Sequence, residues 1–214
     1  MQYNFLAVEG NIGSGKTSLA IMLSKHYQAN LILECFEKNP FLPKFYNDLE
    51  KNSFPLEIFF LAERYHQLKS QKEQDLFKTI TIADYFFEKS KLFAQNNLKN
   101  DELQLFNNLF EIMFSCLPKP DMLIYLYSDI ARLQQNIKKR GRDFEQEIPD
   151  LYLQNIQNKY LDYLKKQNHF PVLLLDISEV DFKEDEKVYS RIKQLLEYSY
   201  ELGVHQFNLS EAIL

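Results

Sequence analysis

Residues 4–27 read NFLAVEGNIGSGKTSLAIMLSKHY, and this stretch decides the first part of the fold. Residues 4–8 are a short apolar run, followed by a loop rich in glycine, asparagine and serine and then by apolar residues at helical spacing. An apolar run, a glycine loop and a helix in this order are typical of the start of a β-α unit. We therefore expect a strand over residues 4–8 and a helix over residues 18–27.

The loop has the spacing of a phosphate-binding site. Residues 10–17 read GNIGSGKT, which matches GxxxxGKT. Glycines let backbone N–H groups turn inward around a phosphate, and the helix N-terminus adds the positive end of its dipole. The lysine is expected to reach the β- and γ-phosphates, and the threonine hydroxyl to bind Mg²⁺. The sequence thus predicts binding of ATP or GTP by Gly10, Asn11, Ile12, Gly13, Ser14, Gly15, Lys16, Thr17 and Ser18.

Four more apolar runs have the character of strands buried on both faces, which is typical of a parallel sheet covered by helices. They are residues 31–35, 79–84, 122–129 and 172–176. Apolar residues recur at helical spacing over residues 56–68, 101–114, 150–164 and 185–199. This alternation predicts an α/β fold. Asp101 is expected to cap the second of these helices, and Gly203 to end the last, which leaves residues 201–214 as a possible loosely docked tail.

The chain has 214 residues, of which 45% are hydrophobic and 26% charged, as expected for one globular domain over residues 1–214. No run of about 18 apolar residues is present, so we expect no membrane-spanning helix. The net charge of −5 argues against binding to nucleic acid. Cys35 and Cys116 lie far apart among apolar neighbours, which predicts two buried thiols in a reducing cytoplasm and no disulfide.

The length fits a small kinase better than other nucleotide-binding classes. A GTPase normally carries a base-reading NKxD motif, whereas residues 158–161 read NKYL. A motor or an oligomeric ATPase normally needs a longer chain.

Two carboxylates end predicted strands. Glu34 lies at the end of the second strand and Asp84 at the end of the third. Because ligands of open α/β sheets gather at the carboxyl ends of the strands, both acids are expected near the γ-phosphate. One could accept a proton from an attacking hydroxyl, and the other could hold Mg²⁺. Alternatively, either acid is a helix cap or a solvated strand end.

A basic run, KKRGR at residues 138–142, stands out in this acidic chain. It could be a solvated helix C-terminus, where cations favour the dipole, or a weak nucleic-acid patch. Beside a phosphate loop we favour a lid over about residues 139–148, because kinases stabilise the transferring phosphoryl group with arginines.

Together these segments resemble the deoxynucleoside kinase family, the group containing deoxycytidine, deoxyguanosine and insect-type multisubstrate kinases. The resemblance is carried, in the family's order, by VEGNIGSGKTSLA (8–20), the strand end at Glu34, NPFLPKFYND (39–48), FPLEIFFLAER (54–64), ADYFFEKSKLFA (83–94), KRGRDFEQEIPDLYL (139–153) and VLLLDISEVDF (172–182). It implies a P-loop kinase fold with a five-stranded parallel sheet, helices on both faces, and usually a homodimer. The implied activity is ATP-dependent phosphorylation of a deoxynucleoside 5′-hydroxyl with Mg²⁺.

The resemblance also implies roles for residues at the reacting centre. Glu34 is similar to the general base for the 5′-hydroxyl, and Asp84 to the acid of the Asp/Glu-Arg-Ser motif near Mg²⁺. The lid arginines that contact ATP phosphates correspond to Arg140 and Arg142.

Further matches concern the nucleoside. Tyr46 and Glu145 resemble the pair that holds the sugar 3′-hydroxyl. Arg64 and Phe93 match base-pocket positions, with Phe93 as a stacking ring.

Two positions depart from the family pattern. The motif's arginine and serine are Tyr85 and Phe86 here, so the missing charge must come from elsewhere, for example from Lys89. Glu57 replaces a base-reading glutamine. An ionised glutamate only accepts hydrogen bonds, and guanine presents two adjacent donors, so we expect a purine substrate and a lean toward deoxyguanosine. A Glu57 that is rotated away, or protonated and therefore like glutamine, would give no such preference.

Two other functions fit parts of the pattern. A nucleoside monophosphate kinase of the thymidylate type shares the loop and sheet, but Glu34 beside the acceptor would repel a monophosphate. A non-catalytic nucleotide-binding subunit is favoured by Tyr85 and opposed by the retained Lys16, Thr17, Glu34 and Glu145.

Overall fold

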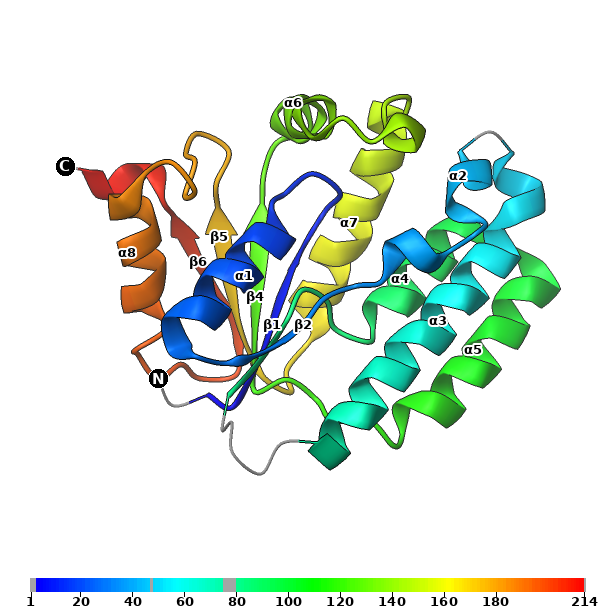
Figure 1. Ribbon diagram of the computed structural model, residues 1–214, viewed down its shortest axis with the longest axis horizontal. Helices are drawn as coiled ribbons and strands as arrows, with labels where there is room; N and C mark the ends of the chain where they lie inside the picture. The colour runs from blue at the N-terminus through cyan, green and yellow to red at the C-terminus, as the bar shows by residue number, and fades with distance from the viewer. Residues whose placement is uncertain (1–2, 47, 75–79, 214) are drawn as a thin grey trace.

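The computed structural model describes residues 3–46, 48–74 and 80–213 (Figure 1). Its centre is a six-stranded sheet in the order β2-β3-β1-β4-β5-β6, with every neighbouring pair parallel. The strands are β1 (Phe5–Gly10), β2 (Asn30–Ile32), β3 (Thr81–Ala83), β4 (Met122–Tyr127), β5 (Pro171–Asp176) and β6 (Gly203–Asn208). The α/β class with a parallel sheet is therefore confirmed.

Helices connect these strands and cover them. They are α1 (Lys16–Tyr27), α2 (Leu42–Phe45), α3 (Leu49–Gln74), α4 (Lys89–Asn97), α5 (Asn100–Phe114), α6 (Ile130–Arg140), α7 (Asp150–Lys166) and α8 (Glu186–Leu195), with short 3₁₀ turns at Phe36–Lys38, Asp143–Glu145 and Ser210–Ile213. No helix in the described ranges has both the length and the apolar character that a membrane crossing requires.

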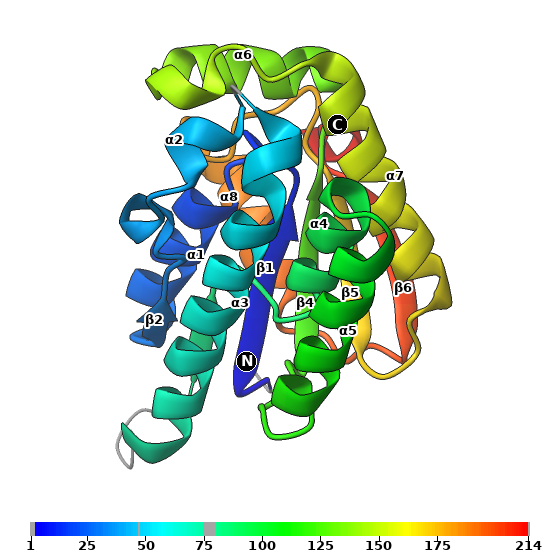
Figure 2. The same ribbon diagram turned by 90° about the vertical axis from the view of Figure 1, so that its right-hand side faces the viewer.

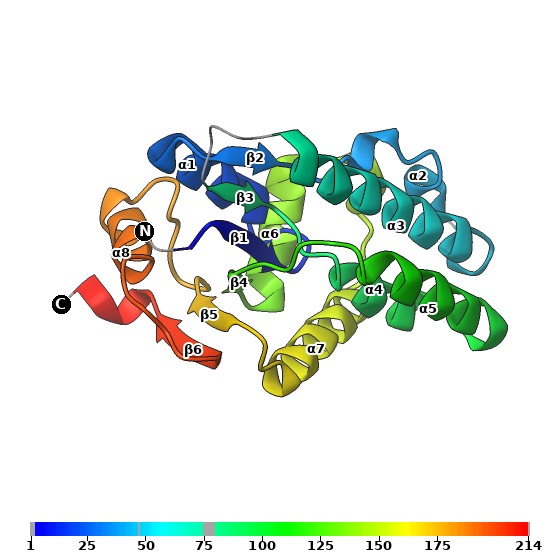
Figure 3. The ribbon, with the colours of Figure 1, turned by 90° about the horizontal axis from the view of Figure 1, so that it is seen from below.

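Alternating side chains of the strands build a core on each face of the sheet. Leu6 and Val8 of β1 pack with Leu19 in the cluster beneath α1 and α8. Ala7, between them, packs with Ile156 in the cluster beneath α4 and α7. Figure 3 shows these two helical layers on opposite sides of the sheet. Because both faces are covered, the central strands β4 and β5 are near-continuous apolar runs, as predicted.

Beyond the second layer, α3, α4 and α5 form a helical bundle around a third apolar cluster (Figure 2). The phosphate loop follows β1, at the carboxyl end of the sheet, and α6 crosses above it (Figure 1). The bundle and α6 thus flank the edge of the sheet at which the predicted site residues gather.

The C-terminal segment corrects several predictions. The sheet has six strands rather than five, because residues predicted as a loosely docked tail form β6 beside β5. Gly203 begins this strand, whereas α8 ends at Leu195, so the predicted role as helix cap is wrong. Side chains along β6 alternate between half-buried and exposed, and this pattern lacks the continuous apolar run used to find the other strands.

Smaller differences concern helix ends and thiols. Lys99, not Asp101, is the N-cap residue of α5, and Asp101 lies in its first turn. Helix α3 begins before Pro55, which the predicted helix excluded. The two cysteines are free, as predicted, but Cys35 is only half-buried and Cys116 is exposed.

Candidate active site

The phosphate loop depends on glycine at two positions, Gly13 and Gly15. Gly13 has φ +86°, and a Cβ there would lie 2.7 Å from the carbonyl oxygen of Leu133 in α6. Gly15 also has φ +86° and forms the left-handed N-cap of α1. Asn136 of α6 donates a hydrogen bond to the carbonyl of Gly13 (2.9 Å). The loop is therefore fixed to α6 at a distance that no side chain would permit.

Polar residues of the loop differ in what they contact. Asn11 is buried, and its side-chain amide donates to the backbone carbonyl of Leu153 in α7 (2.8 Å), so it links the phosphate loop to α7. The Ser14 hydroxyl is buried and has no hydrogen-bond partner in the described part of the chain. Burial lowers the pKa of Lys16 to about 8, and Lys89 adds to the effect. A bound triphosphate would raise this pKa again, because its negative charge favours the ammonium form.

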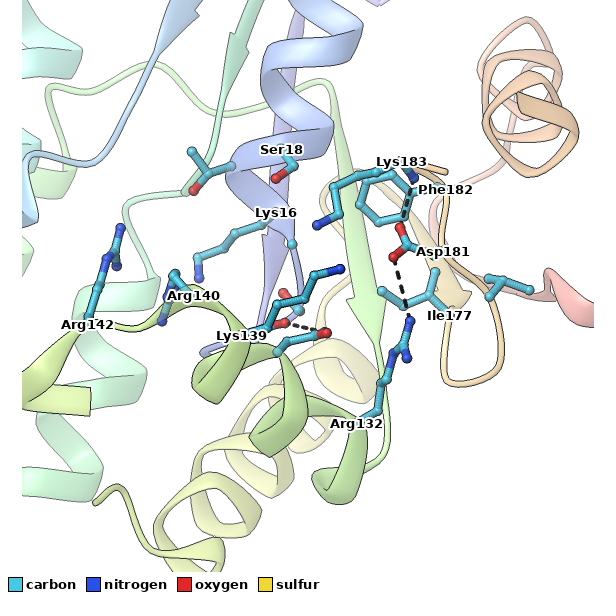
Figure 4. Close-up of a pocket in the computed structure, with 16 residues that line it drawn as sticks. Lys16, Ser18, Arg132, Lys139, Arg140, Arg142, Ile177, Asp181, Phe182 and Lys183 are labelled. Carbon is cyan, nitrogen blue, oxygen red and sulfur yellow. Dashed lines mark hydrogen bonds and ion pairs between the residues drawn. The ribbon is translucent and has the colours of Figure 1, made fainter. Parts of the chain in front are cut away.

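A donor pocket opens above the loop, between α6 and residues 177–183 (Figure 4). Its walls include the basic side chains of Arg132, Lys139, Arg140, Arg142 and Lys183. Arg132 lies 3.8 Å from Asp181, which links α6 to the opposite wall. Excess positive charge around a phosphate loop is what a polyphosphate requires. Arg132 was not singled out from sequence, and residues 172–182 were quoted only for the family resemblance, with no role at a ligand site assigned to them.

Glu34 is the centre of a buried ionic cluster. Its Oε1 accepts hydrogen bonds from Nε (2.9 Å) and Nη2 (2.6 Å) of Arg64, and its Oε2 accepts one from Nζ of Lys89 (2.8 Å). Burial would raise the pKa of Glu34, but Lys89 and Arg64 outweigh it and hold the pKa well below its ordinary value. Glu34 is therefore ionised and oriented at neutral pH.

Lys89 places a positive charge beside Glu34, and the family's arginine position is Tyr85 in this chain. Tyr85 is fully buried, and its hydroxyl donates to Gln67 (2.7 Å). Phe86 belongs to the core beneath α7. Both substituted positions have thus become part of the apolar packing. The hypothesis that Lys89 could replace the arginine agrees with its contact to Glu34.

Thr17 and Asp84 lie together, as a Mg²⁺ site requires. The Thr17 hydroxyl donates to Oδ2 of Asp84 (2.6 Å), and Oδ1 of Asp84 accepts from the backbone N–H of Glu34 (2.7 Å). A hydroxyl and one carboxylate beside the phosphate loop fit Mg²⁺, which proteins hold through one or two carboxylates plus substrate phosphates.

The lid arginines meet at Glu145. Arg140 and Arg142 both form ion pairs with this buried carboxylate, and Arg142 stacks 3.7 Å from the ring centroid of Phe36. Four side chains, those of Lys16, Thr17, Arg140 and Arg142, line both the donor pocket and a second, neighbouring pocket. The two pockets therefore adjoin, with these four side chains at their boundary.

A family model described as deoxynucleoside kinase matches residues 6–199. The chain belongs to the deoxynucleoside kinase family. It is 37% identical to a deoxyguanosine kinase of Bacillus subtilis over 201 residues, which cover 90% of this chain and 97% of that one. A deoxyadenosine/deoxycytidine kinase of the same bacterium is 32% identical over 203 residues, covering 88% and 89%.

A solved structure of deoxyadenosine kinase from M. mycoides, with bound products, has the same fold. Its TM-score is 0.78 at 25% identity, with 91% of this chain and 100% of that chain covered. The protein is thus a kinase that phosphorylates deoxynucleosides, and the two neighbouring pockets are the candidates for binding its donor and its acceptor.

The acceptor pocket of this kinase contains the residues predicted for the nucleoside. Its lining includes Glu34, Tyr46, Glu57, Arg64, Asp84, Phe93 and Glu145. Lys89 Nζ lies 5.7 Å from the ring centroid of Phe93. The guanidinium of Arg64, which lines this pocket as predicted, also contacts Glu34 and the hydroxyl of Ser90 (2.7 Å).

Sequence reasoning missed several residues of this pocket, and three of them contact predicted site residues. Asn97 donates a hydrogen bond to Oε1 of Glu57 (2.6 Å). The ring of Tyr152 contacts that of Tyr46 edge-on, with 6.2 Å between centroids, and the guanidinium of Arg142 lies over the ring of Phe36. They come from α4, α7 and the turn after β2, and only tertiary packing brings them together. Glu9, which is buried and accepts a hydrogen bond from the Tyr160 hydroxyl (2.9 Å), was also overlooked, although a charge directly after an apolar run was a visible signal.

Proposed function

We propose that this kinase uses ATP and Mg²⁺ to phosphorylate the 5′-hydroxyl of purine deoxynucleosides, with deoxyguanosine preferred. The single observation that carries the base preference is Glu57, a carboxylate that is 1% exposed in the acceptor pocket. The deoxyguanosine kinase similarity agrees with it.

The donor half of the reaction rests on charge. Lys16 and the loop N–H groups hold the β- and γ-phosphates, while Arg140 and Arg142 lie between the two pockets. Mg²⁺, when held by Thr17 and Asp84, would neutralise charge on the phosphates. The lid arginines then stabilise charge on the three oxygens of the transferring group.

The acceptor half rests on Glu34. The 5′-oxygen attacks the γ-phosphorus, the new O–P bond forms as the bond to the β-phosphate oxygen breaks, and ADP leaves. The proton of the 5′-hydroxyl passes to Glu34. Lys89 and Arg64 keep this carboxylate ionised and fixed, which suits a transition state in which charge and position matter more than basicity.

Substrate orientation follows from the remaining lining. Tyr46 and Glu145, which line the acceptor pocket, would hold the sugar 3′-hydroxyl, and Phe93, in the same lining, would stack on the base. We also expect a homodimer, which light scattering after gel filtration measures, and a cytoplasmic location.

A coupled assay of ATP consumption tests the proposal. Deoxyguanosine should support turnover, whereas deoxyguanosine monophosphate should not, because Glu34 would repel its phosphate. Turnover with the monophosphate alone would contradict the assignment, as would ATP binding without turnover on any deoxynucleoside.

A further inference from the structure

The base end of the acceptor pocket contains a contact between α3 and α4 that no motif marks. Nδ2 of Asn97 donates to Oε1 of Glu57 at 2.6 Å. Oε2 of Glu57 is buried and has no hydrogen-bond partner in the described part of the chain. Both side chains line the pocket. Oε2 is therefore left to a ligand, because a buried polar atom without a partner is costly, and Oε1 keeps a second lone pair beside the one that accepts from Asn97.

We propose that Asn97 is a positioning residue for base selection, which holds Glu57 so that its ionised form selects guanine and its protonated form admits adenine. This inference rests on the proposed function. An ionised carboxylate only accepts hydrogen bonds, and it matches the adjacent N1–H and N2 amino donors of guanine. Adenine places an acceptor nitrogen beside its amino group, so it needs the donor that a protonated carboxyl supplies.

The groups around Glu57 make both forms accessible. Burial raises the pKa of Glu57 to about 7, while Arg64 of the same helix and Asn97 and Lys89 of α4 favour the ionised form. Glu34, after β2, opposes ionisation. Tyr152 of α7 and Tyr46 after α2 also face the carboxylate and are themselves neutral at this pH, because burial raises the pKa of each hydroxyl further above its ordinary value.

The sign of the pH effect follows from this arrangement. Glu57 loses its proton as the pH rises through about 7, so selectivity for guanine should increase with pH. The hydrogen bond from Asn97 stabilises the ionised form of Glu57, so its removal should move the rise in selectivity for guanine to higher pH.

The test is the ratio of kcat/KM for deoxyguanosine to that for deoxyadenosine, measured on the full chain with ATP between about pH 5.5 and 8.5. The ratio cancels pH effects on ATP binding and on Glu34, which both substrates share. In the wild type it should rise about tenfold or more with pH, judging from bidentate base contacts. Glu57→Gln should give a lower, flat ratio, because an amide does not titrate in this range.

Asn97→Ala should shift the midpoint of the rise to higher pH. Asn108→Ala, at an exposed position of α5, is the matched control and should follow the wild type. A ratio independent of pH in the wild type overturns the proposal without any variant, and an unshifted midpoint in folded Asn97→Ala removes the role of Asn97. Phosphorylation of deoxyguanosine with a flat ratio refutes this inference alone, whereas no phosphorylation of deoxyguanosine at any pH refutes the proposed function.

Discussion

Lys89→Met should be among the most damaging single changes that leave the fold intact. Lys89 is 3% exposed, and its Nζ lies 2.8 Å from Glu34 Oε2. A hydrogen bond to a charged group is worth about 1.5–3 kcal/mol, which corresponds to a loss of about 10- to 150-fold in kcat/KM. Folding should survive, because Arg64 still pairs with Glu34. Loss of a cation also raises the pKa of Glu34, so activity should fall at a higher pH than in the wild type as the pH is lowered.

Steady-state kinetics with saturating ATP and a thermal melt measure these effects. The loss should lie mainly in kcat, because Lys89 orients the group that takes the proton. Lys89→Arg should restore part of the activity. Lys91→Met is the matched control, since Lys91 lies on the same helix as Lys89 and pairs at the surface with Glu111 of α5. Wild-type kcat/KM in a folded Lys89→Met variant would refute the idea that this lysine replaces the motif arginine.

Three further changes test other parts of the site. Glu34→Gln should lower kcat by about 10²- to 10⁴-fold, the usual contribution of acid–base catalysis, and near-normal turnover would reject Glu34 as proton acceptor. Gly13→Ala, which brings a Cβ to 2.7 Å from a backbone oxygen, should lower the melting temperature and weaken ATP binding more than Gly141→Ala, where nothing lies within 4 Å. Tyr46→Phe should lose about 2- to 10-fold of the preference for deoxyguanosine over 2′,3′-dideoxyguanosine, and an unchanged preference would remove Tyr46 from sugar recognition.

Local chemistry made part of this site predictable from sequence. The phosphate loop could be predicted from the spacing of its glycines and lysine, because the backbone of the loop itself determines where Gly13, Gly15 and Lys16 must stand. Glu34 and Asp84 followed from their places at strand ends, since parallel strands bring their carboxyl ends to one edge.

The side-chain contacts that the sequence did not predict depend on tertiary packing. Asn97 reaches Glu57 across 40 positions, through the contact between α3 and α4. Arg64 was matched to the base pocket from its position in a motif, and its ion pair with Glu34, an anion brought near by the turn after β2, was not predicted. Strand β6 was missed because an edge strand needs only one buried side, so it lacks the apolar run of a central strand.

A competition assay tests the central claim most directly. The wild-type kinase receives equal concentrations of deoxyguanosine, deoxyadenosine, deoxycytidine and thymidine with limiting ATP and Mg²⁺ at about pH 7.5, and the monophosphate products are quantified by mass spectrometry. If the buried Glu57 reads the base, deoxyguanosine monophosphate is the main product, and its share falls in Glu57→Gln. Deoxycytidine monophosphate as the main product of the wild type would contradict the account.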